Sequence, residues 1–115
     1  MNQDCIFCKI IDGKITTQKL YEDDLFVVVK DISPKANVHC LAIPKEHYSK
    51  LADMSERQAV DLGKIFAKLP DVIANVLGLA NGYRLIINQG EDAGQTVFHL
   101  HIHIVGGQKM DFIPA

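Results

Sequence analysis

Three histidines near the end of the chain, His99, His101 and His103, are the residues whose type and spacing point most directly to chemistry. Single apolar residues separate them, in the order His-Leu-His-Ile-His. Because side chains alternate across a β-strand, this spacing predicts three imidazoles on one face, each about 7 Å from the next. Val97 would share their face. The opposite face would be apolar and would pack against a helix through Phe98, Leu100, Ile102 and Ile104.

This row of imidazoles has three interpretations. Exposed polar positions on an amphipathic strand need no chemistry, but three of the chain's five histidines in strict alternation disfavour that explanation. A catalytic zinc with three histidine ligands is the second. The outer two rings of one strand are too far apart to share a metal, although two of the three could bind one with help from elsewhere. Nucleophilic catalysis by imidazole is the third, and we favour it.

The favoured interpretation has a chemical rationale. Imidazole titrates near neutral pH, so a useful fraction is unprotonated at pH 7. A phosphoryl group on imidazole is labile, so water can break such an intermediate. The flanking histidines would protonate a leaving group or stabilise phosphate charge.

The elements that must position these residues follow from the apolar periodicity. Ser55 and Gln58 form a capping-box pattern at the start of a helix that runs to about residue 78. Its apolar face is predicted from three- and four-residue spacing to hold Ala59, Leu62, Phe66, Leu69, Ile73 and Val76. Pro70 is expected to kink this helix or to start a second one. A short helix is expected at 5–12, closed by Gly13, and strands are expected at 18–22, 25–30, 38–43, 83–88 and 97–105. The prediction is therefore an α+β fold with a mainly antiparallel sheet.

Composition limits the class of protein. The 115 residues suit one domain over 1–115, and a net charge of -2 gives no basic footprint for nucleic acid. No apolar stretch reaches the ~20 residues of a membrane span, and the first residues do not have the pattern of a signal peptide. The cysteines are Cys5, Cys8 and Cys40, an odd number with a tight Cys-x-x-Cys pair. This usage fits a reducing compartment, so we expect a cytoplasmic protein.

Five segments together resemble the histidine triad (HIT) family. The triad segment is Gln95–Gly107 (QTVFHLHIHIVGG), and the others are 6–11 (IFCKII), 31–34 (DISP), 39–47 (HCLAIPKEH) and 82–88 (GYRLIIN). They cover nearly the whole chain in the family's order. The resemblance is closest to the Hint branch, the purine nucleoside phosphoramidate hydrolases. It implies a HIT-like fold of about five mainly antiparallel strands, one long helix and a short N-terminal helix.

The resemblance also implies roles at matching positions. His101 would attack the α-phosphorus of an adenosine nucleotide, with its other ring nitrogen donating to a backbone carbonyl, expected to be that of His99. His103 would contact the phosphate and help the leaving group depart, and His39 would hydrogen-bond within the histidine cluster. Asp31 would accept hydrogen bonds from the ribose, unless it is only a turn residue before Ser33-Pro34. Polar contacts to the phosphate or leaving group would come from Asn88, Gln95 and Thr96, and Val97 would also lie in the nucleotide site. An apolar purine slot, or alternatively plain hydrophobic core, would be formed by Ile6, Phe7, Ile10, Val29, Ile32 and Leu41.

Cys5-x-x-Cys8 departs from the animal Hint proteins, which lack cysteines there. By itself this pair is ambiguous between a metal site, a redox site and no function. Similarity to zinc-bearing members of the superfamily implies a structural zinc held by Cys5, Cys8, His47 and His99, which would clamp the N-terminal turn onto the histidine strand and fix the neighbouring nucleophile. Cys40, opposite His39 by alternation, is expected to be a small buried residue outside the metal set.

The expected activity is hydrolysis of adenosine phosphoramidates or acyl-adenylates through a nucleotidyl-histidine. Two alternatives stay open: cleavage of diadenosine polyphosphates, as in the related Fhit branch, and a non-enzymatic nucleotide-binding module. The expected partners are an AMP-type purine nucleotide and, by family resemblance, a second copy of the chain; no organic cofactor, nucleic acid or membrane is expected.

Overall fold

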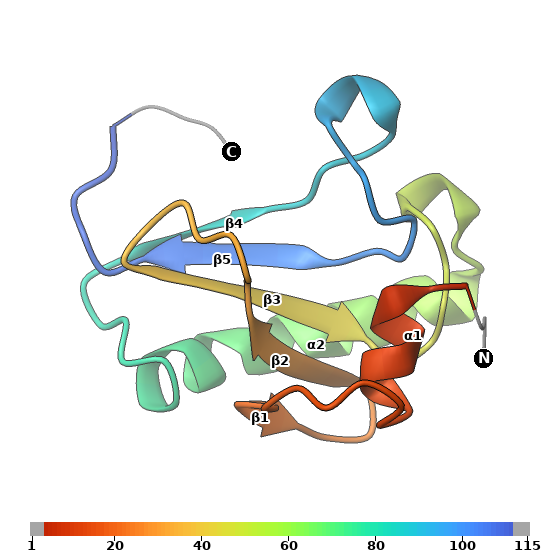
Figure 1. Cartoon of the computed structure of the whole chain (residues 1–115), viewed down its shortest axis with the longest axis horizontal. Helices are drawn as coiled ribbons and strands as arrows, with labels where there is room; N and C mark the ends of the chain where they lie inside the picture. Colours follow the sequence, from red (N-terminus) through yellow and green to blue (C-terminus); the bar gives the residue numbers. More distant parts are fainter. Residues whose placement is uncertain (1–3, 112–115) are drawn as a thin grey trace.

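The computed structural model describes residues 4–111 as one five-stranded antiparallel sheet with a helix on each face (Figure 1). The strand order is β1-β2-β3-β5-β4, so β3 and β5 lie in the middle and β4 forms one edge. This is the α+β architecture that the sequence predicts. The predicted domain limits, residues 1 and 115, lie outside the described residues. The elements are α1 (Ile6–Ile11), β1 (Tyr21–Glu22), β2 (Phe26–Lys30), β3 (Val38–Pro44), η1 (Leu51–Asp53), α2 (Glu56–Asn75), β4 (Tyr83–Ile86), η2 (Glu91–Ala93) and β5 (Ile102–Gly106).

The two faces of the sheet bury different clusters because neighbouring residues of a strand point in opposite directions. Cys40 pairs with Ile104, and both face α2 in the larger hydrophobic cluster. Leu41 pairs with His103 on the other face, where α1 packs. Residues 26–29 of β2 are therefore all buried, two on each face. The predicted placement of Cys40 in the core is confirmed.

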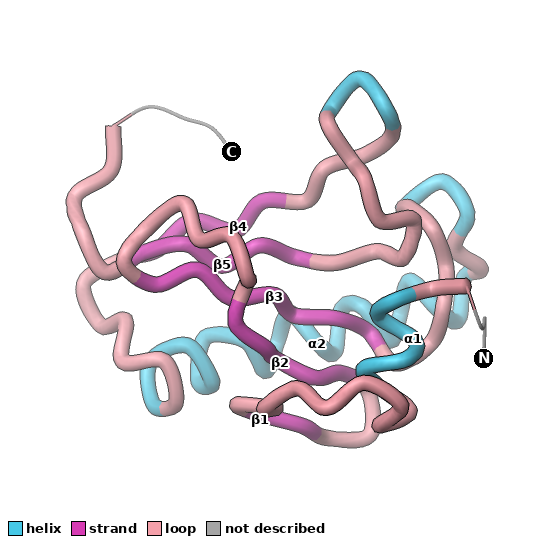
Figure 2. Tube along the Cα trace, viewed as in Figure 1, coloured by secondary structure: helices cyan, strands magenta, loops and turns pink. Residues whose placement is uncertain are grey.

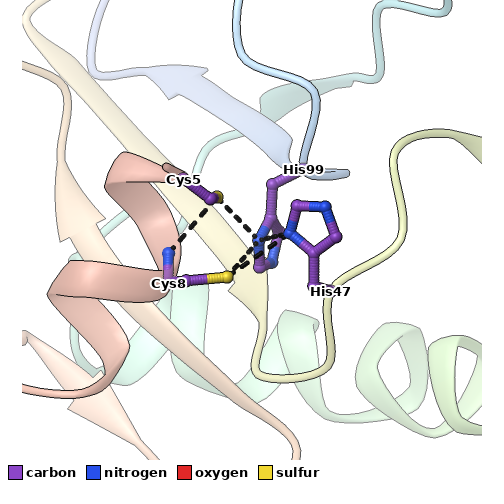
Figure 3. A group of neighbouring side chains, drawn as sticks. All are labelled: Cys5, Cys8, His47 and His99. Carbon is purple, nitrogen blue, oxygen red and sulfur yellow. Dashed lines mark hydrogen bonds between the residues drawn. The ribbon is translucent and has the colours of Figure 1, made fainter. Parts of the chain in front are cut away.

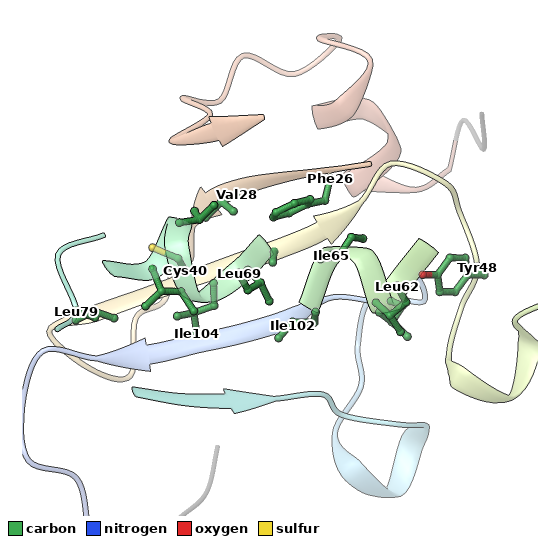
Figure 4. Packing of buried hydrophobic residues seen from close by; sticks show 14 residues of the cluster. Phe26, Val28, Cys40, Tyr48, Leu62, Ile65, Leu69, Leu79, Ile102 and Ile104 are labelled. Carbon is green, nitrogen blue, oxygen red and sulfur yellow. The ribbon is translucent and has the colours of Figure 1, made fainter. Parts of the chain in front are cut away.

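Helix α2 covers one face of the sheet (Figure 4). Its capping box is present, with Gln58 N donating to Ser55 Oγ at 3.1 Å and Ser55 N donating to Gln58 Oε1 at 2.8 Å. The buried stripe is Leu62, Ile65, Leu69, Val72 and Ile73. The expected apolar face was thus partly wrong: Ala59 and Val76 are exposed, because the stripe facing the sheet runs through Ile65 and Val72.

Pro70 does not start a second helix, since α2 continues through it. Its side chain is exposed, and the ring removes a single backbone donor. Its neighbours Leu69, Val72 and Ile73 are buried, so packing on the sheet holds the helix together across the gap. Among residues 4–111 no helix combines the length and apolar character required to cross a bilayer.

The last strand differs most from the prediction. A strand over 97–105 is expected, but β5 begins at Ile102, and the segment before it is a loop (Figure 2). Leu100 N donates to Tyr48 O at 2.8 Å, so this loop bonds to the 45–50 turn instead of a neighbouring strand. Phe98 is half exposed and does not pack against α2, whereas Leu100, Ile102 and Ile104 do. The strand predicted at 83–88 likewise ends at Ile86.

Candidate active site

A cavity of about 610 Å³ opens on the α1 side of the sheet. Its walls come from α1, from β2, β3 and β5, and from the loops that follow β2 and β4. Fourteen sequence-predicted residues outside the metal set line it: Ile6, Phe7, Ile10, Val29, Asp31, Ile32, His39, Leu41, Asn88, Gln95, Thr96, Val97, His101 and His103. Lys30 and Lys35, which sequence reasoning missed, also line it.

His101 is held with one ring nitrogen free. Its Nδ1 lies 2.8 Å from the carbonyl oxygen of His99. A carbonyl accepts only, so Nδ1 carries the hydrogen and Nε2 keeps its lone pair. The distance agrees with the expected bond to His99. The ring is also wedged edge-on between Phe7 and His103, with both centroid separations 5.0 Å.

His39 and His103 form a hydrogen-bonded pair with defined tautomers. Lys35 N donates to His39 Nδ1 at 3.0 Å, so the hydrogen of the neutral His39 ring must sit on Nε2. That Nε2 lies 2.9 Å from His103 Nδ1 and donates to it. His103 therefore carries its own hydrogen on Nε2. Burial, reinforced by the nearby rings of His101 and His39, lowers the pKa of His103 to about 4, against a weaker opposing effect of Asp31.

Asp31 completes this cluster. One carboxylate oxygen accepts from Ser33 N at 2.7 Å, as in a turn, so the alternative role considered for this residue is present in the structure. The other oxygen lies 3.4 Å from His39 Nε2 and 4.0 Å from His103 Nδ1. Burial lowers the pKa of His39, while the Asp31 carboxylate opposes that shift.

Asp31, His39 and His103 are close enough to resemble a metal site. The ring tautomers argue against it, because a metal on His39 Nε2 would require the hydrogen on Nδ1. That nitrogen accepts the Lys35 amide, so two hydrogens would face each other. His39 and His103 form a hydrogen-bonded pair instead, with the Asp31 carboxylate beside it.

Gln95 organises the loop above the histidines. Its Oε1 accepts from Gly90 N at 2.8 Å, and its Nε2 donates to Ser49 O at 2.7 Å and to Val97 O at 3.2 Å. Both amide hydrogens are thus used within the chain. Gln95 holds the residue 90–95 loop in place, and the direct phosphate contact expected of it would require one of these bonds to break. Asn88 and Thr96 line the same cavity, where their contacts to phosphate stay predictions.

A second cluster lies beside the cavity, where Cys5 and Cys8 of the α1 region meet His47 and His99 (Figure 3). Cys8 Sγ lies 3.3 Å from His47 Nδ1 and 3.5 Å from His99 Nδ1. Cys5 Sγ lies 3.4 Å from His99 Nδ1, and the two Nδ1 atoms are 3.1 Å apart. All four candidate ligand atoms lie within 4.8 Å of one another. The structure therefore assembles all four residues that the sequence assigns to zinc.

The donor set fits a tetrahedral zinc ion. Zn–S bonds of about 2.3 Å and Zn–N bonds of about 2.0 Å require S···N edges of about 3.5 Å and an N···N edge of about 3.3 Å. The observed separations come within about 0.3 Å of these edges. His99 is fully buried, and its Nε2 donates to Pro44 O at 2.7 Å, which leaves Nδ1 bare and directed at the cluster. Burial also lowers the pKa of His99 to about 4, which keeps the ring neutral as a ligand must be.

Comparison with known proteins bears on this geometry. A family model described as "HIT domain" matches residues 12–110. The chain belongs to the HIT family. HitA of Neisseria gonorrhoeae is 48% identical over 102 residues, which cover 89% of this chain and 94% of that protein. A HIT family hydrolase from Clostridium thermocellum is 46% identical, with a TM-score of 0.89 over 96% of each chain. A zinc-bound histidine triad family protein from Mycobacterium smegmatis is 33% identical, with a TM-score of 0.77 over 94% of this chain and 80% of that one.

Within this HIT fold the triad histidines divide between two sites. The alternation argument put His99, His101 and His103 in one row facing a common pocket. The structure corrects that expectation for His99, which is fully buried beside Cys5, Cys8 and His47 and does not line the cavity. The reason is that the backbone before Ile102 leaves the strand, so alternation no longer governs its side chains.

Proposed function

We propose that this HIT protein is a nucleotide hydrolase or transferase of the Hint branch. It would act on adenosine (purine) nucleoside phosphoramidates or acyl-adenylates through a nucleotidyl-histidine. The observation that carries the proposal is the bond from His101 Nδ1 to His99 O, which leaves a bare Nε2 on a ring that lines the cavity. A buried hydrogen bond on one nitrogen is a common way to orient the other for nucleophilic attack.

In the proposed reaction, the Nε2 lone pair of His101 forms a bond to the α-phosphorus as the P–N bond breaks. The departing nitrogen takes a proton from solvent, and the Nε2–H of His103 would hydrogen-bond to the leaving group as it departs, because the neutral ring cannot give up that hydrogen as an acid. Water then attacks the phosphorus of the intermediate, releases AMP and frees His101. One proton of that water replaces the proton taken by the amine, so the reaction consumes one water molecule in all.

Nucleotide recognition is proposed for the remaining walls of the cavity. The Asp31 carboxylate would accept from the ribose hydroxyls through the oxygen that does not bind Ser33 N. Ile32 and Ile6, which are 97% and 47% exposed at this cavity, support an apolar ligand portion there, since a bound purine would remove their side chains from water. The AMP-type ligand is a proposal on this basis.

Zinc is proposed as the structural metal of the cluster formed by Cys5, Cys8, His47 and His99. The tetrahedral fit of the donors supports it, and so does the zinc in the relative from Mycobacterium smegmatis. When bound, the metal would cross-link α1 to the loop that contains His99. Because the two cysteines must stay reduced to bind it, we also propose a reducing compartment, the cytoplasm, as the site of action.

The homodimer is likewise proposed. In the described part of the chain β4 pairs with β5 alone, so its outer backbone edge faces away from the sheet, and Leu85 on it is 37% exposed. Such edges are usually covered by another chain or element. Light scattering on the purified protein should give twice the chain mass, and a monomeric mass would contradict the proposal.

The activity is tested with a fluorogenic adenosine phosphoramidate. Wild type should turn it over, and His101→Ala should lose at least about 10³-fold in kcat/KM while circular dichroism shows an unchanged fold. Mass spectrometry of a quenched slow substrate should find AMP linked to His101. Nucleotide binding without turnover would instead favour the binding-module alternative. Preferred cleavage of diadenosine polyphosphates over the phosphoramidate would favour the Fhit-like one.

A further inference from the structure

Helix α1 belongs to two sites at once. Cys5 caps its N-terminus and Cys8 lies in its first turn, and both sulfurs point to the metal cluster (Figure 3). Between and after them, Ile6, Phe7 and Ile10 line the cavity that we propose for the nucleotide. The same six-residue helix is therefore a metal-binding element and a wall of the substrate site.

This helix depends on its contacts for its position. Six residues are too few for a helix to be stable on its own, because the conformational entropy lost on nucleation exceeds the stabilisation from so few hydrogen bonds. Phe7, Cys8 and Ile10 are buried against β2 and β3 in the smaller of the two hydrophobic clusters. The metal cluster adds an attachment at the other side, to His47 and His99. Losing the metal would remove that attachment and loosen the cavity wall.

A second connection runs through His99. Its Nδ1 faces the metal cluster, and its carbonyl oxygen accepts the bond that orients His101. Phe7 lies between these groups, with its ring edge-on to His99 at 5.9 Å and to His101 at 5.0 Å. Phe7 thus lines the cavity, as the sequence predicts, and its ring also packs against the two histidines.

We infer that metal occupancy and nucleotide binding are positively coupled, with Phe7 as the positioning residue between the two sites. This inference rests on the proposed function for the nucleotide site. With the metal bound, α1 and His99 hold the cavity in the form that accepts a nucleotide; a bound nucleotide, by holding α1 in place, strengthens metal binding in return. Thermodynamic linkage requires the two effects to be equal in size.

The direct test uses zinc-loaded, folded protein. Its zinc affinity is measured by competition with a chromophoric chelator, with and without saturating AMP, and a protein-free titration corrects for zinc bound by AMP itself. AMP should tighten zinc binding about five-fold or more, the lower range of measured couplings. Calorimetric AMP titrations of loaded and chelator-treated protein should show the same factor. A change in zinc affinity below two-fold would overturn the inference.

A matched pair of variants tests the role of Phe7. Phe7→Leu keeps the four metal ligands and removes the ring contacts to both histidines, so the coupling factor should fall towards one. Phe66→Leu makes the same change in a partly buried residue of α2, on the other face of the sheet, and should keep the wild-type factor. Equal factors in both variants would refute the role of Phe7. AMP binding that is tight but independent of zinc would refute the coupling alone, whereas no AMP binding to loaded wild type would refute the proposed function with it.

Discussion

The hydrogen-bonded pair of His39 and His103 should make this protein acid-sensitive, and His103 provides the clearest measure of that effect. Its pKa is lowered to about 4 in the folded chain, from an ordinary value near 6.5. As pH falls below about 6.5, the unfolded chain takes up a proton at this residue and the folded chain does not. The contribution of His103 to the free energy of unfolding is therefore fully present above pH 6.5 and declines as the pH falls towards 4.

The size of the effect follows from the two pKa values. Between pH 7.5 and pH 5, the unfolded state gains about 2 kcal/mol from protonating this single residue. His103→Asn should remove that contribution, because asparagine does not titrate and its side-chain oxygen can still accept from His39 Nε2. The variant is expected to be less stable at neutral pH but to lose about 2 kcal/mol less than wild type on acidification.

Urea unfolding followed by far-UV circular dichroism, at both pH values and with equal zinc, gives the four free energies required. The difference between the two proteins cancels the titration of groups that do not interact with residue 103, and what remains belongs to His103 together with its direct partner His39. If wild type and His103→Asn lose the same stability to within about 0.5 kcal/mol, the tautomer and burial argument for His103 is wrong.

Three further predictions concern other parts of the fold. Cys8→Ala should abolish zinc binding by metal analysis and lower the melting temperature, while Cys40→Ala should keep one zinc per chain; equal zinc in both would contradict the assigned ligands. Pro70→Ala should raise the free energy of unfolding by about 1 kcal/mol or more, because it restores a backbone donor on an exposed helix position; a loss in urea titrations would show that the proline ring is needed there. Gln95→Ala should cost about 2 kcal/mol and reduce turnover, since it leaves Gly90 N and two carbonyls without their partner; unchanged melting would refute its role in holding the loop.

Local pattern and family resemblance together predicted much of this site. Alternation correctly places Ile102 and Ile104 against α2 and His103 on the cavity face, because these residues lie within β5. The capping box at Ser55 could also be predicted from the sequence, since its two residues are only three positions apart. Resemblance supplied the four residues of the metal cluster, although Cys5 and Cys8 lie before the span that the family model matches.

The remaining features depend on partners that are distant in sequence. The strand starts late because Leu100 N bonds to Tyr48 O, a contact fixed by how the turn after β3 folds back. The hydrogen on His103 is set by the backbone amide of Lys35, through His39. Neither backbone atom differs chemically from any other in the chain, so no residue type signals these bonds.

The burial of Cys40 has a practical consequence for studying this protein. Its thiol is 2% exposed between the central strand and α2, and burial raises its pKa, so an alkylating reagent meets neither an accessible nor an ionised sulfur. Labelling at Cys40 therefore requires the sheet and α2 to separate. Where the proposed zinc protects the other two thiols, the rate of alkylation at Cys40 would report how often the central core opens.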